Sequence, residues 1–433
     1  MAKIQGIYAR EVLDSRGNPT LEAQITLEDG SRGVAIVPAG ASTGTYEAAE
    51  LRDGELIRYG GMGVVKAVQS VEWEITQVVV GLEASDQTLV DKTLIEFDQT
   101  PNKRRLGANA ILGVSLAVAR AAANSARLPL YRYLGGAAAN ELPVPLVNIM
   151  SGGIHGGGNV DFQDFMLVPL RAATYTQALA DVNAVYRAAK SVLQDRGVYR
   201  AGVADEGGYA PALKTNEAGF EVMVEAMERA GLEPGRDAAI AVDVAATHFC
   251  ERGNYRLSVS DEELDADDMV ERLANCVDRY PVICIEDGLD EEDWEGWKTL
   301  TQRLGDRCQL IGDDLFVTHP DRLERGIEQG IANAILVKIN QIGTLTETLD
   351  VIRLAVRNGY QPVISARSGE TEDDFIADLA VATGASLIKI GAITRSERLA
   401  KYNRLKRIEH ELGSRALYRG AEVFSSIFEV KAS

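Results

Sequence analysis

Short apolar runs that end in a polar or charged residue recur through the second part of the chain. The residues at their ends are, in order, Asp243, Glu286, Asp313, Lys338, the pair Arg367 and Ser368, and Lys389. Amphipathic helical patterns lie between the runs, for example at 265–280 and 344–359. A short apolar strand followed by a helix, repeated, is typical of a parallel sheet covered on both faces. At roughly 25–30 residues per unit, the pattern predicts an α/β fold with a closed β/α barrel.

In such a barrel the chemistry takes place at the carboxyl ends of the strands, where these polar residues lie. Asp243, Glu286 and Asp313 come from three consecutive units. Three carboxylates at one rim repel each other unless a cation lies among them. Oxygen ligands without Cys or His suit a hard ion, so we expect Mg²⁺ first and Mn²⁺ second.

Two lysines and an arginine follow on the next strands. A lysine beside another cation has a lowered pKa, so Lys338 or Lys389 could act as a general base while the other binds a substrate carboxylate. Arg367 and Ser368 offer a planar fork and a hydroxyl to an oxyanion such as phosphate. Together these residues predict a pocket that binds an anionic acid and removes a proton next to its carboxylate.

Composition excludes several other classes of protein. The 433 residues carry 64 acidic and 45 basic side chains, a net charge of −19. Such an acidic chain is a poor candidate for binding nucleic acid or an anionic membrane. The start, MAKIQGIYAR, has no apolar signal core, and the four cysteines form no C-x-x-C pair. We therefore expect a reduced cytoplasmic protein with incidental thiols.

The first part of the chain is organised differently. Two strands at 20–31 and 32–40 are expected to form a hairpin, and a buried helix is expected at 108–126. The Gly- and Ala-rich stretch at 134–145, with two prolines, predicts a linker between domains at 1–134 and 143–433. The loop AGASTG at 39–44 is a candidate lid, and His155, set among glycines at 151–159, is expected near a ligand.

The motifs of the chain resemble those of the enolase family over essentially its whole length. They are DSRGNPT (14–20), LGANAILGVSLAVA (106–119), DEGG (205–208), IGDDLFVT (311–318), KINQIGTLTET (338–348), RSGETEDDFIADL (367–379) and RSERLAKYN (395–403). The resemblance implies an N-terminal α+β domain, a modified β/α barrel and a homodimer. It also implies that Asp243, Glu286 and Asp313 hold one Mg²⁺, and that Ser42 binds a second Mg²⁺ together with the substrate phosphate.

The same resemblance implies roles in the loss of water from 2-phosphoglycerate. Lys338 would remove the C2 proton, Glu206 would be the acid for the departing C3 hydroxyl, and Lys389 would hold the carboxylate. The phosphate would be surrounded by Arg367, Ser368 and His155.

The chain departs from the family pattern in the expected pocket. Ala366 stands where enolases have His in SHRSGET, and Asp164, next to the substrate-binding candidate Gln163, replaces Glu in QEFM. Losing a positioned imidazole typically costs about 10²–10⁴ in rate. Asp164 is a catalytic candidate with its carboxylate retracted by about 1.5 Å, enough to break a tight hydrogen bond. Further replacements relative to the family are Ala39, Ile154 and Gly288.

These departures favour a diverged, Mg²⁺-dependent lyase that acts on a specialised phospho or phosphono acid, as in phosphinate antibiotic biosynthesis. The alternatives are an ordinary glycolytic enolase and a non-catalytic protein that kept the fold. The sequence favours a surface loop for His248, five residues after Asp243, and leaves open whether His248 or Asp164 replaces the missing imidazole.

Overall fold

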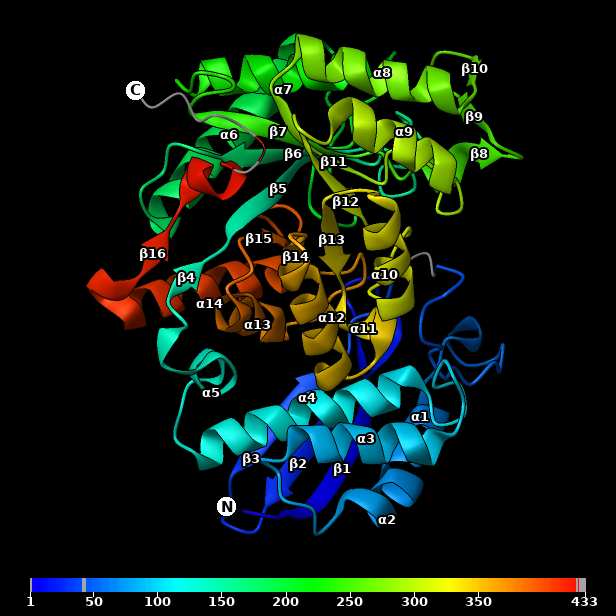
Figure 1. Cartoon of the computed structure of the whole chain (residues 1–433), viewed down its shortest axis with the longest axis vertical. Coiled ribbons are helices and arrows are strands. Elements are labelled where there is room, and N and C mark those ends of the chain that lie inside the picture. The colour runs from blue at the N-terminus through cyan, green and yellow to red at the C-terminus, as the bar shows by residue number, and fades with distance from the viewer. Residues whose placement is uncertain (1, 41–43, 426, 428–433) are drawn as a thin grey trace.

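The computed structural model describes residues 2–40, 44–425 and 427, which form a small N-terminal domain and a larger barrel (Figure 1). The small domain has an antiparallel sheet in the order β1–β2–β3, so the expected hairpin is confirmed as β2 and β3. Strand β1 was not predicted from the sequence. The elements of this domain are β1 (Ile4–Leu13), β2 (Pro19–Leu27), β3 (Arg32–Ile36), α1 (Val65–Gln69), α2 (Thr76–Val79), α3 (Gln87–Asp98) and α4 (Ala108–Ser125).

Helix α4 confirms the helix expected at 108–126 and joins the two domains. One side packs on β2 and β3, and the other contacts α11 (Ile339–Ile342) and α12 (Leu345–Arg357) of the barrel. Burial on both sides explains why the helix is apolar all round. Its small residues let β3 approach closely, since a Cβ on Gly33 would lie 2.1 Å from the backbone oxygen of Ala117.

In the described part of the chain, eight strands close into a barrel in the order β11-β12-β13-β14-β15-β5-β6-β7. Strand β6 runs antiparallel to both neighbours, whereas the other pairs are parallel. The predicted β/α barrel is therefore confirmed with one reversed strand. The strands are β5 (Val144–Ser151), β6 (Asp164–Pro169), β7 (Ala238–Asp243), β11 (Val282–Glu286), β12 (Gln309–Gly312), β13 (Ala334–Val337), β14 (Gln361–Ser365) and β15 (Leu387–Lys389).

Helices surround the barrel, as Figure 1 shows. With α12, they are α6 (Tyr175–Asp195), α7 (Glu217–Arg229), α8 (Ala266–Arg279), α9 (Trp294–Leu304), α10 (Pro320–Gln329), α13 (Phe375–Thr383) and α14 (Ser396–Leu412). Helices α8 and α12 lie where the patterns at 265–280 and 344–359 predicted them. A small sheet of β8 (Cys250–Glu251), β9 (Asn254–Leu257) and β10 (Glu262–Leu264) follows β7.

The stretch at 134–145, expected as a linker, contains regular structure. It takes in the end of α5 (Leu130–Gly135), and its strand β4 (Glu141–Leu142) pairs with β16 (Leu417–Tyr418) near the C-terminus. Of the two prolines that suggested a linker, Pro143 separates β4 from β5, and Pro145 is the second residue of β5.

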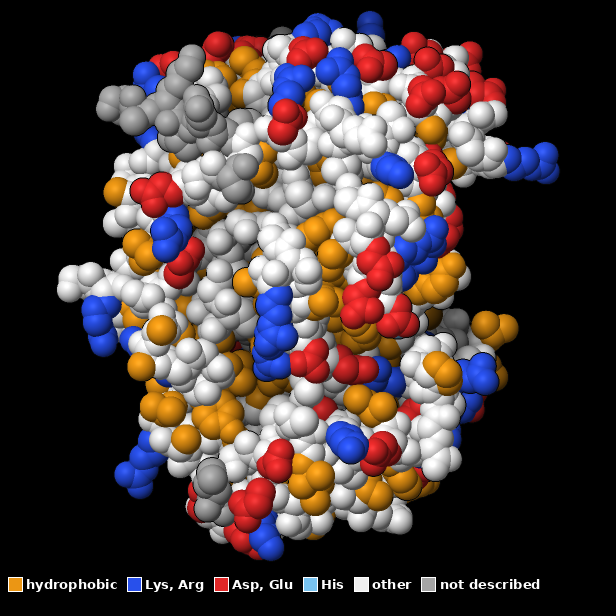
Figure 2. All heavy atoms as spheres, viewed as in Figure 1, with side chains coloured by type: hydrophobic (Ala, Val, Ile, Leu, Met, Phe, Trp, Pro, Cys, Tyr) orange, Lys and Arg blue, Asp and Glu red, His pale blue; other side chains and the backbone are white. Residues whose placement is uncertain are grey.

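Ion pairs fix the small domain against the barrel. Arg120 on α4 reaches Asp373 at 2.5 Å and Asp374 at 2.9 Å, and Lys103 bonds Glu347 at 2.9 Å. Elsewhere acidic and basic side chains are interspersed over the face shown in Figure 2. Among the helices the structure describes, none combines the length and apolarity needed to span a bilayer.

Candidate active site

The polar residues at the strand ends meet in one pocket at the carboxyl rim of the barrel. Asp243, Glu286 and Lys389 are the last residues of β7, β11 and β15. Asp313 and Lys338 directly follow β12 and β13. The pocket encloses about 510 Å³, including the solvent at its mouth. Its polar lining includes Asp243, Asp313, Lys338, Arg367, Ser368 and Lys389, with Glu47, His155, Gln163, Glu206, Asp287 and Asp314.

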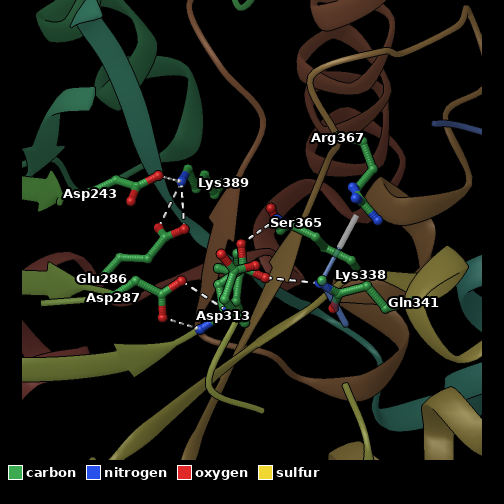
Figure 3. Close-up of polar contacts among 12 residues, drawn as sticks. Asp243, Glu286, Asp287, Asp313, Lys338, Gln341, Ser365, Arg367 and Lys389 are labelled. Atoms are coloured by element: carbon green, nitrogen blue, oxygen red, sulfur yellow. Dashed lines mark hydrogen bonds and ion pairs between the residues drawn. The ribbon is translucent and has the colours of Figure 1, made fainter. Parts of the chain in front are cut away.

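One half of the rim is organised around Lys389. Its Nζ lies 2.8 Å from Oδ2 of Asp243 and 2.7 Å from both carboxylate oxygens of Glu286 (Figure 3). Burial, and then Asp243, raise the pKa of Glu286 well above its usual value. Gln163 donates to the same oxygen of Asp243 at 3.1 Å. The lysine thus balances two carboxylates that water does not reach.

The neighbouring part of the rim pairs Lys338 with Asp313. Their side chains form an ion pair, and Gln341 donates to the other carboxylate oxygen of Asp313 at 3.0 Å (Figure 3). Burial is the largest influence and lowers the pKa of Lys338, but the nearby carboxylates, Asp313 first, together outweigh it, so that the pKa is raised. The lowered pKa expected from the sequence depends on a cation beside the lysine and stays a prediction. Lys338 can act as a base only once Asp313 is engaged elsewhere.

The donor set at this rim suits a hard cation. Asp243, Glu286 and Asp313 supply carboxylate oxygens, and Oδ1 of Asp243 is buried without a hydrogen-bond partner in the described part of the chain. Such an atom has an open coordination position. The three residues therefore fit a magnesium ion.

The closest acidic groups at the rim nevertheless differ from the predicted trio. Among the described residues, ligand atoms of Asp287, Asp313 and Asp314 all lie within 4.8 Å of one another, and so do those of His155, Asp164 and Glu206. Asp287 accepts the backbone N–H groups of Asp313 and Asp314, each at 2.8 Å. Asp287 therefore shapes the turn that presents Asp313. Its position beside Glu286 in the sequence was a signal that the sequence analysis did not use.

A second group of residues gathers where β5 and β6 meet the rim. Nδ1 of His155 lies 3.3 Å from Asp164 and 4.0 Å from Glu206. Ser151 donates to the other oxygen of Asp164 at 2.7 Å, and Asn148 donates to Glu206 at 3.2 Å. Because β6 is reversed, its first residue, Asp164, faces the pocket side of the barrel. The structure thus brings Glu206, from a later loop, next to His155 and Asp164.

The protonation preferences within this group differ from expectation. Burial raises the pKa of Asp164, whereas for Glu206 the nearby cations, Arg398 first, outweigh burial and lower its pKa. Burial lowers the pKa of His155, but its hydrogen bond with Asp164 and the surrounding carboxylates together outweigh burial and raise that pKa. Glu206, the acid expected from the sequence, therefore gives up its proton more readily than an ordinary glutamic acid, and Asp164 and His155 hold protons more readily.

Arg367 links the pocket to the small domain. Its guanidinium bonds the two carboxylate oxygens of Glu47 at 2.9 and 3.2 Å, and Asn340 at 3.0 Å. Ser368 lines the same pocket. Glu47 was not predicted, although it lies just beyond the candidate lid at 39–44. Residues 41–43 of that lid, Ser42 among them, lie outside the described residues.

The pocket also contains two small residues and an unexpected histidine. Ala245 and Ala366 line it where larger side chains would fill it. His248, expected on a surface loop, lines the same pocket while staying exposed at its mouth.

Comparison with known families supports the geometry. Residues 139–427 match the model of the enolase C-terminal TIM barrel domain, and residues 4–134 match that of the enolase N-terminal domain. The chain belongs to the enolase family. Enolases generally use Mg²⁺, and the acidic rim is compatible with that ion. Family membership and the acidic cluster together make this chain an enolase-superfamily enzyme.

Proposed function

We propose that the protein is a Mg²⁺-dependent lyase that forms an enolpyruvyl phosphate or phosphonate from a 2-phosphoglycerate-like acid. The observation that carries the proposal is the placement of two groups across the barrel. Lys338 follows β13 and Asp164 begins β6, and these strands lie four positions apart in either direction round the eight-stranded ring. An elimination needs a base on one side of the substrate and an acid on the other.

The chain's own residues would divide the reaction between them. Once Asp313 is engaged elsewhere, Lys338 loses its own proton to solvent, and its neutral amine takes the C2 proton on Nζ. Lys389, with two buried carboxylates beside it, is placed to hold the substrate carboxylate. The bond between C3 and its oxygen then breaks, and the hydroxyl leaves as water with a proton from Asp164 or His155. Arg367 and Ser368 supply donors for the phosphorus oxyanion.

Asp243, Glu286 and Asp313 would hold the first Mg²⁺, and Ser42 a second. When bound, the metal supplies positive charge that stabilises the enolate of the substrate carboxylate. Mn²⁺ offers the same oxygen-ligand chemistry.

The pocket favours a specialised substrate over 2-phosphoglycerate itself. Ala366 brings no donor to the leaving-group side, and Ala245 and Ala366 leave room beside the reacting atoms. An enzyme with this profile is carboxyphosphonoenolpyruvate synthase of phosphinate antibiotic biosynthesis, whose substrate carries a carboxyphosphonate group. Glycolytic enolase is the second candidate, favoured by the complete set of acidic rim residues.

A homodimer is part of the proposal. Exposed apolar side chains gather on β1 and on the loop after β3, and Arg58 of that loop bonds Glu11 of β1 at 2.8 Å. The exposed residues are Tyr8, Leu13, Leu56, Ile57, Tyr59 and Met62. Apolar patches of this kind mark interaction surfaces.

We also propose a cytoplasmic location, since Cys276, Cys284 and Cys308 are buried free thiols.

Proton NMR in D₂O with Mg²⁺ and 2-phosphoglycerate tests the function, because loss of the C2 proton and growth of vinyl signals are separate readouts. We expect C2 exchange with slow or no vinyl formation, and faster vinyl formation by Ala366→His. Fast vinyl formation by the unchanged protein would identify a glycolytic enolase. No exchange together with no Mg²⁺-dependent binding of the acid would favour a non-catalytic protein.

A further inference from the structure

His248 lies at the mouth of the pocket on the short helix η4 (Ala246–Phe249), which follows β7. Its side chain makes no hydrogen bond or ion pair within the described part of the chain. A histidine that lines a pocket without a partner has hydrogen-bonding capacity available to a ligand.

The backbone around His248 is held in place. Ala245 has a φ of +49°, in the left-handed region that a residue with a Cβ rarely adopts. The turn is fixed by bonds from Ala246 N to Asp287 O at 3.1 Å and from Glu291 N to the Thr247 hydroxyl at 3.0 Å. Strained residues persist only where their surroundings impose them, and they cluster at ligand sites. The imidazole is thus carried on a fixed support.

Most charged groups that influence His248 already form ion pairs with other residues. They are Asp243, Asp313, His155 and Lys338. Asp243 is paired with Lys389, and Asp313 with Lys338. Ala245, three residues before His248, and Ala366, across the barrel from it, line the same pocket with methyl groups that offer no donor. A polar substrate group at the mouth of the pocket can therefore accept a hydrogen bond from the imidazole of His248.

We propose that His248 is a specificity residue, which donates a hydrogen bond to a second anionic group of the substrate. This group lies beyond the carboxylate and phosphorus oxyanion that the reaction itself requires. The inference rests on the proposed function and names the feature by which the substrate differs from 2-phosphoglycerate. A neutral imidazole keeps one N–H, so the contact does not depend on the charge of His248.

The test compares two ligands by calorimetry with Mg²⁺: 2-phosphoglycerate, and its analogue with a carboxyl group on phosphorus. A hydrogen bond to a charged group corresponds to about tenfold to hundredfold in affinity. We expect His248→Ala to lose that factor for the carboxylated analogue and less than about threefold for 2-phosphoglycerate. His248→Gln, which keeps an N–H donor, should recover most of the loss, and unfolding midpoints establish that both variants fold.

The outcomes separate the two proposals. If His248→Ala lost equal affinity for both ligands, or none for the analogue, the role of His248 would be overturned. The proposed function would still stand if the unchanged protein exchanges the C2 proton. Failure of the unchanged protein to bind either acid with Mg²⁺ would overturn the proposed function, and the role of His248 with it.

Discussion

Replacing Lys389 by methionine tests how much the buried ammonium stabilises the carboxylates of Asp243 and Glu286. The side chain of Lys389 is 7% exposed, and those of Asp243 and Glu286 are 2% and 1% exposed. Methionine fills a similar volume but leaves two buried carboxylates without their common cation. Breaking a buried ion pair by removing one partner costs about 3–5 kcal/mol. We therefore expect Lys389→Met to lower the free energy of unfolding by about that amount without metal.

Magnesium should reverse part of that loss. With the ammonium gone, the carboxylates are available to the cation, so the variant should bind Mg²⁺ more tightly than the unchanged protein. A ligand at one hundred times its Kd adds about 2.7 kcal/mol to stability. Urea unfolding with and without Mg²⁺ should thus show a larger metal-dependent gain for Lys389→Met, although the variant should no longer catalyse the reaction.

Lys92→Met is a matched control, because Lys92 forms an exposed pair with Glu96 in which both side chains are 67% exposed. Such pairs contribute about 0–1 kcal/mol, so this variant should unfold like the unchanged protein. If Lys389→Met were as stable as that control without metal, or gained no more from Mg²⁺ than the unchanged protein, our account of the rim would be wrong.

Three further predictions concern other parts of the molecule. Gly33→Ala should destabilise by about 1–3 kcal/mol, because its Cβ meets the Ala117 backbone, whereas Gly6→Ala, which meets nothing within 4 Å, should be neutral in the same urea titration. The raised pKa of His155 contributes stability below its unfolded pKa of about 6.5, and that contribution is lost as pH rises through the folded pKa. The stability difference between the unchanged protein and His155→Gln should therefore shrink from pH 6 to pH 9, and a constant difference would contradict this pairing. Ile57→Asp should shift a dimer to monomer in sedimentation without changing subunit stability, and an unchanged mass would remove that patch from the interface.

The hydrophobic pattern of the sequence predicted the elements whose buried and exposed positions follow a regular order. Helix α4 is apolar on every side because both domains cover it, and the strand-end residues mark barrel strands because buried charges there need partners. Strand β6 gave no such signal. Asp164 comes at its beginning, so a search for polar residues after apolar runs passes over it.

The sequence predicted most residues of the site, but it did not predict their pKa values or their partners. Spacing places Lys338 and Asp313 at one rim, but only the structure shows that they form an ion pair that raises the pKa of Lys338. Likewise, Arg398 lies far from Glu206 in the sequence and lowers its pKa. Glu47 reaches Arg367 from the other domain, a contact that no local pattern encodes.

The reversal of β6 places two successive loops over one sector of the barrel. Residues 152–163 lead into β6 from the rim, and residues 196–216, between α6 and α7, return to it with Glu206. His155, Gln163 and Glu206 therefore come from segments separate from the strands that end in Asp243, Glu286 and Asp313. A lineage could change the length or sequence of these two loops while the strands that carry the proposed metal ligands stay as they are. New substrates could then arise by exchange of a single sector, with the strands that carry Lys338 and the acidic residues inherited intact.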